Sequence, residues 1–207
     1  KKEQQLLDLE KSLMGTKTEN DKLLTDLKER ELKLKELQKI MKQKDSAVVA
    51  LRNSVTDALL SFKDNGLTVN VKNGKVYVSL SEKLLFSSGS TNVDKKGEEA
   101  LKKLGSVLKK QPDVNVMIEG HTDDVPVAKN TNAAFTDNWD LSVLRATEIT
   151  RILVNEGVKP RKITPAGRAE FSPIAENKTA DSRQKNRRTE IILTPKLDEL
   201  FKILESE

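Results

Sequence analysis

Two charged side chains in this sequence are placed where one zwitterionic ligand could reach both. Asp123 follows the apolar run 114–118, where a strand is expected to give way to a loop, a common position for ligand groups. Arg145 lies four residues after Leu141 and four before Ile149, at or beside the apolar stripe of an expected helix. A carboxylate can balance an ammonium, and a guanidinium can donate two parallel hydrogen bonds to a carboxylate. The pair could therefore bind a ligand that carries both charges.

The same two residues could instead bind each other. A lone charge on a core-facing stripe is costly, so Arg145 needs a carboxylate partner from the protein or from a ligand. An internal ion pair between Asp123 and Arg145 that only fixes the loop would also meet this need. Residue types alone leave both interpretations open.

His121 is the single histidine of the chain, and the chain has no cysteine. Its neighbours Asp123 and Asp124 could suggest a metal site or an acid–base dyad. No second histidine, thiol or nucleophile motif accompanies it, however. We therefore interpret His121 as an orienting or packing residue. We expect no catalytic residue, no metal and no cofactor, and we expect that the protein is not an enzyme.

Composition limits the classes of partner. The 207 residues carry a formal net charge of +5, with 33% charged and 3% aromatic residues. A basic balance suits polyanions, but here the charge is spread along the chain. Nucleic-acid binding would require more basic residues and aromatic platforms, so we expect no nucleic-acid partner. No apolar run approaches the roughly 18 residues of a membrane span. Because residue 1 is Lys, we expect any membrane anchor to lie upstream.

Residues 1–63 form one continuous heptad pattern when Leu6 is placed at position a. The a positions are apolar except for Asn20, and the d positions are mixed. This is a left-handed coiled-coil pattern, about 90 Å long if helical throughout. Asn20 at an a position often favours a two-stranded coil, so we expect a homodimer. The alternative is a single amphipathic helix that lies on another protein. The a positions are Leu6, Leu13, Asn20, Leu27, Leu34, Met41, Val48, Val55 and Phe62.

The rest of the chain alternates between strand and helix patterns. Alternating runs on either side of Asn73-Gly74 predict a hairpin with a type I′ turn. Helices are expected over 94–110 and 139–156, the second ended by Gly157. This order predicts an α+β fold in which helices cover one face of a mixed sheet. The expected strands are 67–72, 75–80, 84–86, 114–119, 162–167 and 189–193, with a loop and short helix over 177–183.

Three parts follow from these patterns. Residues 1–63 are expected to form a coiled-coil stalk, and residues 64–194 a globular domain. Residues 195–207 follow Pro195 with one apolar stripe and are expected to form an amphipathic helix.

Four motifs, in this order, resemble the signature of the OmpA-like C-terminal domain, a family that includes peptidoglycan-associated lipoprotein and MotB. The resemblance covers roughly residues 76–193. Residues 124–126 and 135–139 look most like the MotB branch. The motifs are Gly120-His121-Thr122-Asp123, Leu141-Ser142-x-x-Arg145-Ala146, Gly167 and Asn186-Arg187-Arg188.

The resemblance implies non-catalytic binding of cell-wall peptidoglycan, which tethers an envelope protein or complex to the wall. In the family, an aspartate and an arginine grip the diaminopimelate of the stem peptide, and these roles fall on Asp123 and Arg145. Secondary candidates are Thr122, Asn186, Arg187 and Arg188. The implied place is the periplasm of a Gram-negative bacterium, associated with the outer membrane or anchored in the inner membrane.

Two other hypotheses stay open at this point. The chain could be a structural or adaptor protein of the envelope, whose coil recruits partners and whose wall-binding pocket is degenerate. It could also be a metal-assisted hydrolase built around His121. Binding to purified peptidoglycan without release of soluble fragments would distinguish the first interpretation from both.

Overall fold

The computed structural model describes residues 1–87, 89–127 and 135–196. The chain divides into two compact units, and Lys1–Gln43 and Lys44–Lys196 fall in different ones. The expected C-terminal helix lies outside the described residues from 197 onward. Part of the loop before the second long helix, residues 128–134, lies outside them as well.

Helix α1, Lys2–Ala58, confirms the long helix expected at the N-terminus. Within residues 1–43, its apolar stripe faces solvent. The large side chains of this stripe are between 56% and 64% exposed, which is unusual for residues of this type. They are Leu6, Leu9, Leu13, Leu23, Leu27, Leu34 and Met41.

The same stripe is buried from Val48 onward. Val48, Leu51 and Val55 of α1 are at most 3% exposed and belong to the core of the second unit. The 3-10 helix η1, Leu60–Asn65, continues this contact through Phe62. The heptad pattern predicted that these positions belong to the stalk. Burial shows that the last heptads instead belong to the hydrophobic core of the domain.

The sheet has five strands in the order β1-β2-β5-β3-β4. The strands are β1 Leu67–Lys72, β2 Lys75–Ser81, β3 Val114–His121, β4 Ile163–Gly167 and β5 Arg188–Pro195. Strands β3 and β4 pair in parallel, and the other pairs are antiparallel. Asn73 and Gly74 both have positive φ, 53° and 68°, which confirms the type I′ turn.

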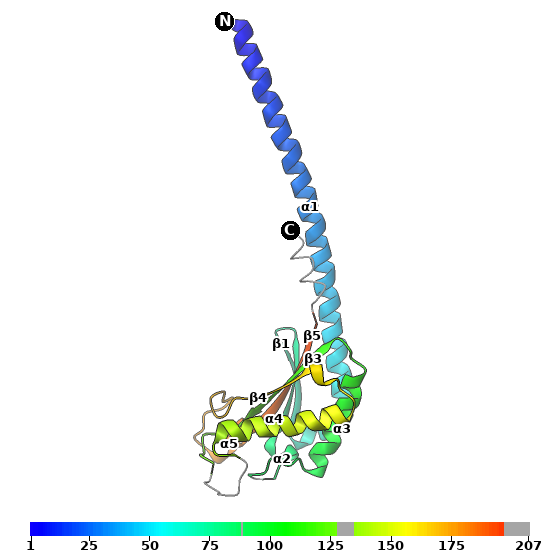
Figure 1. Ribbon diagram of the computed structural model, residues 1–207, viewed down its shortest axis with the longest axis vertical. Coiled ribbons are helices and arrows are strands. Elements are labelled where there is room, and N and C mark those ends of the chain that lie inside the picture. The colour runs from blue at the N-terminus through cyan, green and yellow to red at the C-terminus, as the bar shows by residue number, and fades with distance from the viewer. Residues whose placement is uncertain (88, 128–134, 197–207) are drawn as a thin grey trace. The chain divides into compact units, whose positions relative to one another are not determined.

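One face of the sheet carries the core. Val76, Leu193 and Val116 lie in register across the three central strands, and each is at most 2% exposed. Helices α3, Lys95–Lys109, and α4, Asn138–Asn155, contact each other and cover this face together with the end of α1 (Figure 1). The α+β fold with helices on one face of a mixed sheet is thus confirmed.

One expected strand is wrong. The segment around Leu84 forms a short helix, α2, Glu82–Leu85, and only Phe86 makes an isolated bridge, to Val93. The apolar run was too short to tell a buried strand from a buried helical turn. The remaining elements are η2, Pro160–Lys162, and α5, Ala180–Asn186.

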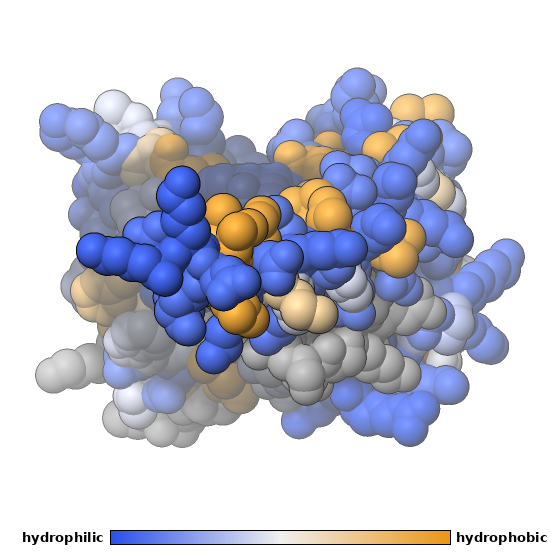
Figure 2. Space-filling view, turned by 90° about the horizontal axis from the view of Figure 1, so that it is seen from above, coloured by the Kyte–Doolittle hydropathy of each residue, from blue (hydrophilic) through white to orange (hydrophobic). Residues whose placement is uncertain are grey.

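The surface seen in Figure 2 is mostly hydrophilic, with small separate groups of hydrophobic side chains. Among the described residues, no helix is both long enough and apolar enough to cross a bilayer.

Candidate functional site

Asp123 lies two residues past the end of β3 and is only 5% exposed. Its Oδ1 accepts a hydrogen bond of 3.2 Å from the backbone N–H of Val125. The loop is fixed to α4 because Asn138 donates through Nδ2 to the backbone oxygens of Asp123 and Val125, at 3.3 and 3.2 Å. On the other side, the backbone N–H of Thr122 donates to the backbone oxygen of Ala169. Asp123 is therefore held in a defined position.

Arg145 points inward from α4 and is 4% exposed. Its Nη2 lies 2.6 Å from Oε1 of Glu82, and its Nε donates to the backbone oxygen of Ser90 at 3.0 Å. The guanidinium carbon lies 4.8 Å from the centre of the Phe86 ring. A buried charge needs a carboxylate partner, and Glu82 is one such partner for Arg145.

Arg187 connects the two halves of the site. Its Nε donates to Oε2 of Glu82 at 2.6 Å, and its Nη1 donates to Oδ2 of Asp123 at 2.5 Å. Burial lowers the pKa of the Arg187 guanidinium, but hydrogen bonds and charges from Asp123 and Glu82 raise it more, so its pKa stands above the ordinary value. The result is a continuous chain of charges, Arg145–Glu82–Arg187–Asp123.

Of the secondary candidates, only Arg187 binds the carboxylate of Asp123 among the described residues. Thr122 is buried, and its hydroxyl donates to the backbone oxygen of Asp123. Asn186 is fully buried and bonds residues 174–177 through both its oxygen and its nitrogen. Arg188 pairs with Glu190 at 2.7 Å, away from the charge chain. Asn186 thus fixes the loop 174–177, and Arg188 pairs with a residue of its own strand, β5.

His121 is 3% exposed, and neither ring nitrogen has a hydrogen-bond partner in the part of the chain that the structure describes. Burial, followed by the charge of Arg188, lowers the pKa of His121 to about 4. One ligand atom each from His121, Glu119 and Glu190 lie within 4.8 Å of one another. Both carboxylates already pair with arginines, Arg168 and Arg188, whose charges oppose a metal cation. This cluster is therefore better suited to stabilising the fold through ion pairs than to binding a metal ion.

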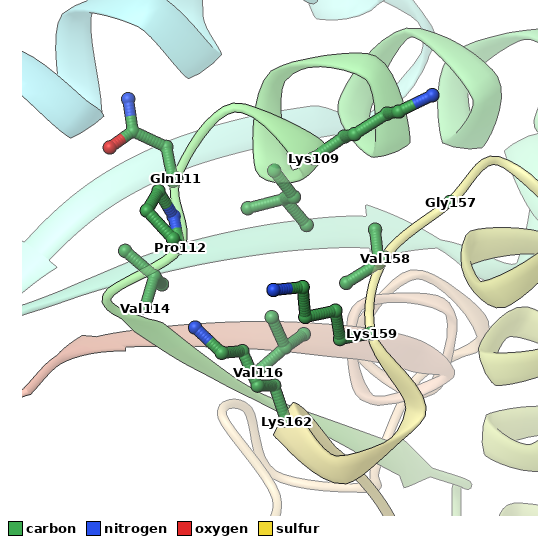
Figure 3. Close-up of a pocket in the computed structure, with 10 residues that line it drawn as sticks. Lys109, Gln111, Pro112, Val114, Val116, Gly157, Val158, Lys159 and Lys162 are labelled. Atoms are coloured by element: carbon green, nitrogen blue, oxygen red, sulfur yellow. The ribbon is translucent and has the colours of Figure 1, made fainter.

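A hollow of about 290 Å³ lies elsewhere, beside the first residues of β3 (Figure 3). Val114, Val116 and Val158 are among the residues that line it, and the side chains of Lys159 and Lys162 extend into it. Asp123 follows the opposite end of the same strand. This hollow is therefore separate from the charge chain.

Glu82 is the member of the site that sequence reasoning missed. It stands 63 positions before Arg145 and 105 before Arg187, so no local spacing connects them. The segment around it was also assigned the wrong secondary structure. Only the packing of α2 near α4 and the end of α5 brings the three together.

Residues 85–187 match the OmpA family, so this chain contains an OmpA family domain. Motility protein B of Bacillus subtilis (strain 168) is 34% identical over 120 residues, which cover 58% of this chain and 45% of that protein. The match covers 62% of the length of Motility protein B from Helicobacter pylori (strain ATCC 700392 / 26695). This chain therefore spans less than two thirds of the length of both relatives.

Solved structures show the same fold. A MotB-like protein from Desulfovibrio vulgaris matches 74% of this chain and 96% of its own, with a TM-score of 0.64 and 25% identity. The cell wall anchor of the T6SS from Pseudomonas aeruginosa matches 69% of this chain and 97% of its own, with a TM-score of 0.61 and 26% identity. One of these two neighbours is thus a protein that anchors an assembly to the cell wall.

Proposed function

We propose that this protein binds peptidoglycan without catalysis, through the diaminopimelate of the stem peptide, and so tethers an envelope protein to the wall. The observation that carries the proposal is the charge-balanced chain of Arg145, Glu82, Arg187 and Asp123, whose side chains are between 4% and 28% exposed. Two positive and two negative groups match a ligand end that carries one ammonium and one carboxylate. The OmpA family match over residues 85–187 supports the same ligand class.

Both ends of the charge chain have unused hydrogen-bonding capacity. A guanidinium has five N–H donors, and Nη1 of Arg145 has no partner among the described residues. A carboxylate can accept about four hydrogen bonds, and Asp123 accepts one on each oxygen from described residues. In the proposed complex, Arg145 binds the ligand carboxylate and Asp123 binds the ammonium.

We also propose that the exposed stripe between Leu6 and Met41 pairs with a second copy of the chain. Its leucines recur at heptad positions, and their exposure leaves a long apolar surface for which a parallel coil is the common solution. The pairing would present two wall-binding domains together, in the envelope compartment that contains peptidoglycan.

The test is a sedimentation assay with two purified walls. One contains diaminopimelate in its stem peptides, and the other contains lysine. The lysine side chain also ends in an ammonium group, but it lacks the second carboxylate of diaminopimelate. We expect the protein to sediment with the first wall, and free diaminopimelate to release it. No soluble fragment should appear.

Equal binding to both walls would contradict the diaminopimelate assignment. Absence of binding to either wall would favour the alternative, an envelope adaptor with a degenerate pocket.

A further inference from the structure

We propose that Glu82 is the positioning residue of this pocket, and that it fixes both arginines so that a ligand carboxylate meets Arg145 in one orientation. The inference rests on the proposed function for its ligand, but its geometry stands without one. Oε1 of Glu82 binds Nη2 of Arg145, and Oε2 binds Nε of Arg187, both at 2.6 Å. One carboxylate thus spans two guanidinium groups from separate elements.

The position of Glu82 follows from its own element. It is the first residue of α2, and its backbone N–H donates to the backbone oxygen of Arg187 at 3.0 Å. The side chain of Glu82 is only 11% exposed. Glu82 therefore contacts Arg187 through both its backbone and its side chain, and this double contact limits how either residue can move.

The contacts of Arg145 show which of its edges stays available. Nη2 of Arg145 donates to Glu82, and Nε donates to the backbone oxygen of Ser90. Nη1 has no partner among the described residues, and Nη2 carries a second hydrogen, so both terminal nitrogens keep donors for the oxygens of a ligand carboxylate. Glu82 consequently supports a bidentate ligand contact instead of competing for the same donors.

Charge gives the second reason. Without Glu82, two arginines would share the single carboxylate of Asp123 in a buried site. An uncompensated buried charge is costly, so the guanidinium groups would move toward water or draw in anions without selectivity. With Glu82 present, the network is neutral, and binding of a zwitterionic end adds no net charge.

Two measurements on the whole chain test the inference, with Glu82→Gln as the variant and Glu98→Gln as its matched control. The side chain of Glu98 is 43% exposed, and its ion pair among the described residues is with Lys102, outside the charge chain. The first measurement needs no ligand. Nitrogen-15 NMR of the arginine side chains should show slow guanidinium rotation for Arg145 and Arg187, and Glu82→Gln should make it fast.

The second measurement is calorimetric binding of two soluble stem peptides, one with diaminopimelate and one with lysine at the same place. We expect the wild type and Glu98→Gln to prefer the first peptide, and Glu82→Gln to reduce that preference about tenfold. General damage to the fold would lower the affinity for both peptides alike, so the ratio of the two affinities would stay unchanged. Thermal melting of each variant monitors the fold.

The outcomes separate the two proposals. Slow rotation that persists in Glu82→Gln, or an unchanged peptide preference, overturns the role of Glu82. Fast rotation in the variant, together with a wild type that prefers neither peptide, supports the positioning role and removes the diaminopimelate proposal. If Glu82→Gln does not fold, Glu82→Asp replaces it. That side chain is one methylene shorter, so it should release one guanidinium and reduce the preference in part.

Discussion

Asp123 and Arg145 are joined through Arg187 and Glu82, and no direct ion pair between them occurs among the described residues. The two candidate ligand groups therefore do not neutralise each other. Each has a protein partner that orients it, and each has further hydrogen-bonding capacity among the described residues. Substitution of either residue should therefore affect ligand binding more than it affects the stability of the fold.

Arg145→Ala should abolish binding to diaminopimelate-containing wall. Removing one member of a buried charge pair at an interface costs roughly 2–5 kcal/mol, enough to erase the binding of a weak module. Asp123→Asn keeps the size of the side chain and should weaken binding by a smaller factor. Sedimentation with purified wall measures both.

Melting temperatures of the same variants provide the control. Arg145→Ala also leaves Glu82 with one guanidinium, so a modest loss of stability is expected. Stable variants whose affinity for the wall is unchanged would exclude both residues from the site.

Gly120→Ala should destabilise the domain, although Gly120 has no side chain to offer the ligand. An added Cβ would lie 2.1 Å from the backbone oxygen of Ser142, so β3 and α4 would have to separate. Overpacking of this kind typically costs about 1–3 kcal/mol. Because α4 carries Arg145, wall binding should fall as well.

Gly15→Ala is the matched control in urea denaturation, since nothing lies within 4 Å of a Cβ at that position. A Gly120→Ala variant as stable as the wild type would show that the strand and helix can move apart freely.

Stability should fall as the pH is lowered from about 6.5 to 4, in part because of His121. Its pKa is lowered from 6.5 to about 4 in the folded protein, first by burial. The unfolded chain therefore binds more protons in this interval, which favours unfolding as the pH falls. The full effect is roughly 3 kcal/mol, reached near pH 4, below which both states are protonated.

Urea denaturation of wild type and His121→Gln at pH 7.5, 5.5 and 4.5 isolates this contribution. The variant should lose less stability over the interval than the wild type. Parallel curves would mean that His121 titrates normally in the folded protein.

A chain that begins at residue 44 should fold and stay monomeric, whereas one that begins at residue 64 should not fold stably. The second lacks Val48, Leu51, Val55, Leu59 and Phe62, all at most 5% exposed. Each large buried side chain contributes about 1.5–3 kcal/mol, and a domain's total stability is only about 5–15 kcal/mol.

Light scattering and circular dichroism measure the two properties, with the whole chain for comparison. The whole chain should be dimeric. If the whole chain is monomeric at high micromolar concentration, the proposed coiled-coil dimer is wrong.

The sequence by itself determined the local elements. Heptad spacing predicted α1, Asn73-Gly74 fixed the hairpin and its turn type, and apolar periodicity predicted α3 and α4. It also marked Arg145 as a charge on a core-facing stripe, which its burial confirms. These features depend on residues a few positions apart, so periodicity reveals them.

Tertiary structure alone decided how the heptad stripe divides and which groups surround the buried arginine. Val48 and Leu34 occupy the same heptad position, yet one is 3% exposed and the other 58%, because only the first belongs to the hydrophobic core of residues 44–196. Glu82 reaches Arg145 across 63 positions, through the packing of a segment whose short apolar run fits strand and helix equally. Contacts over such separations depend on the whole fold, and a single sequence carries no local signal for them.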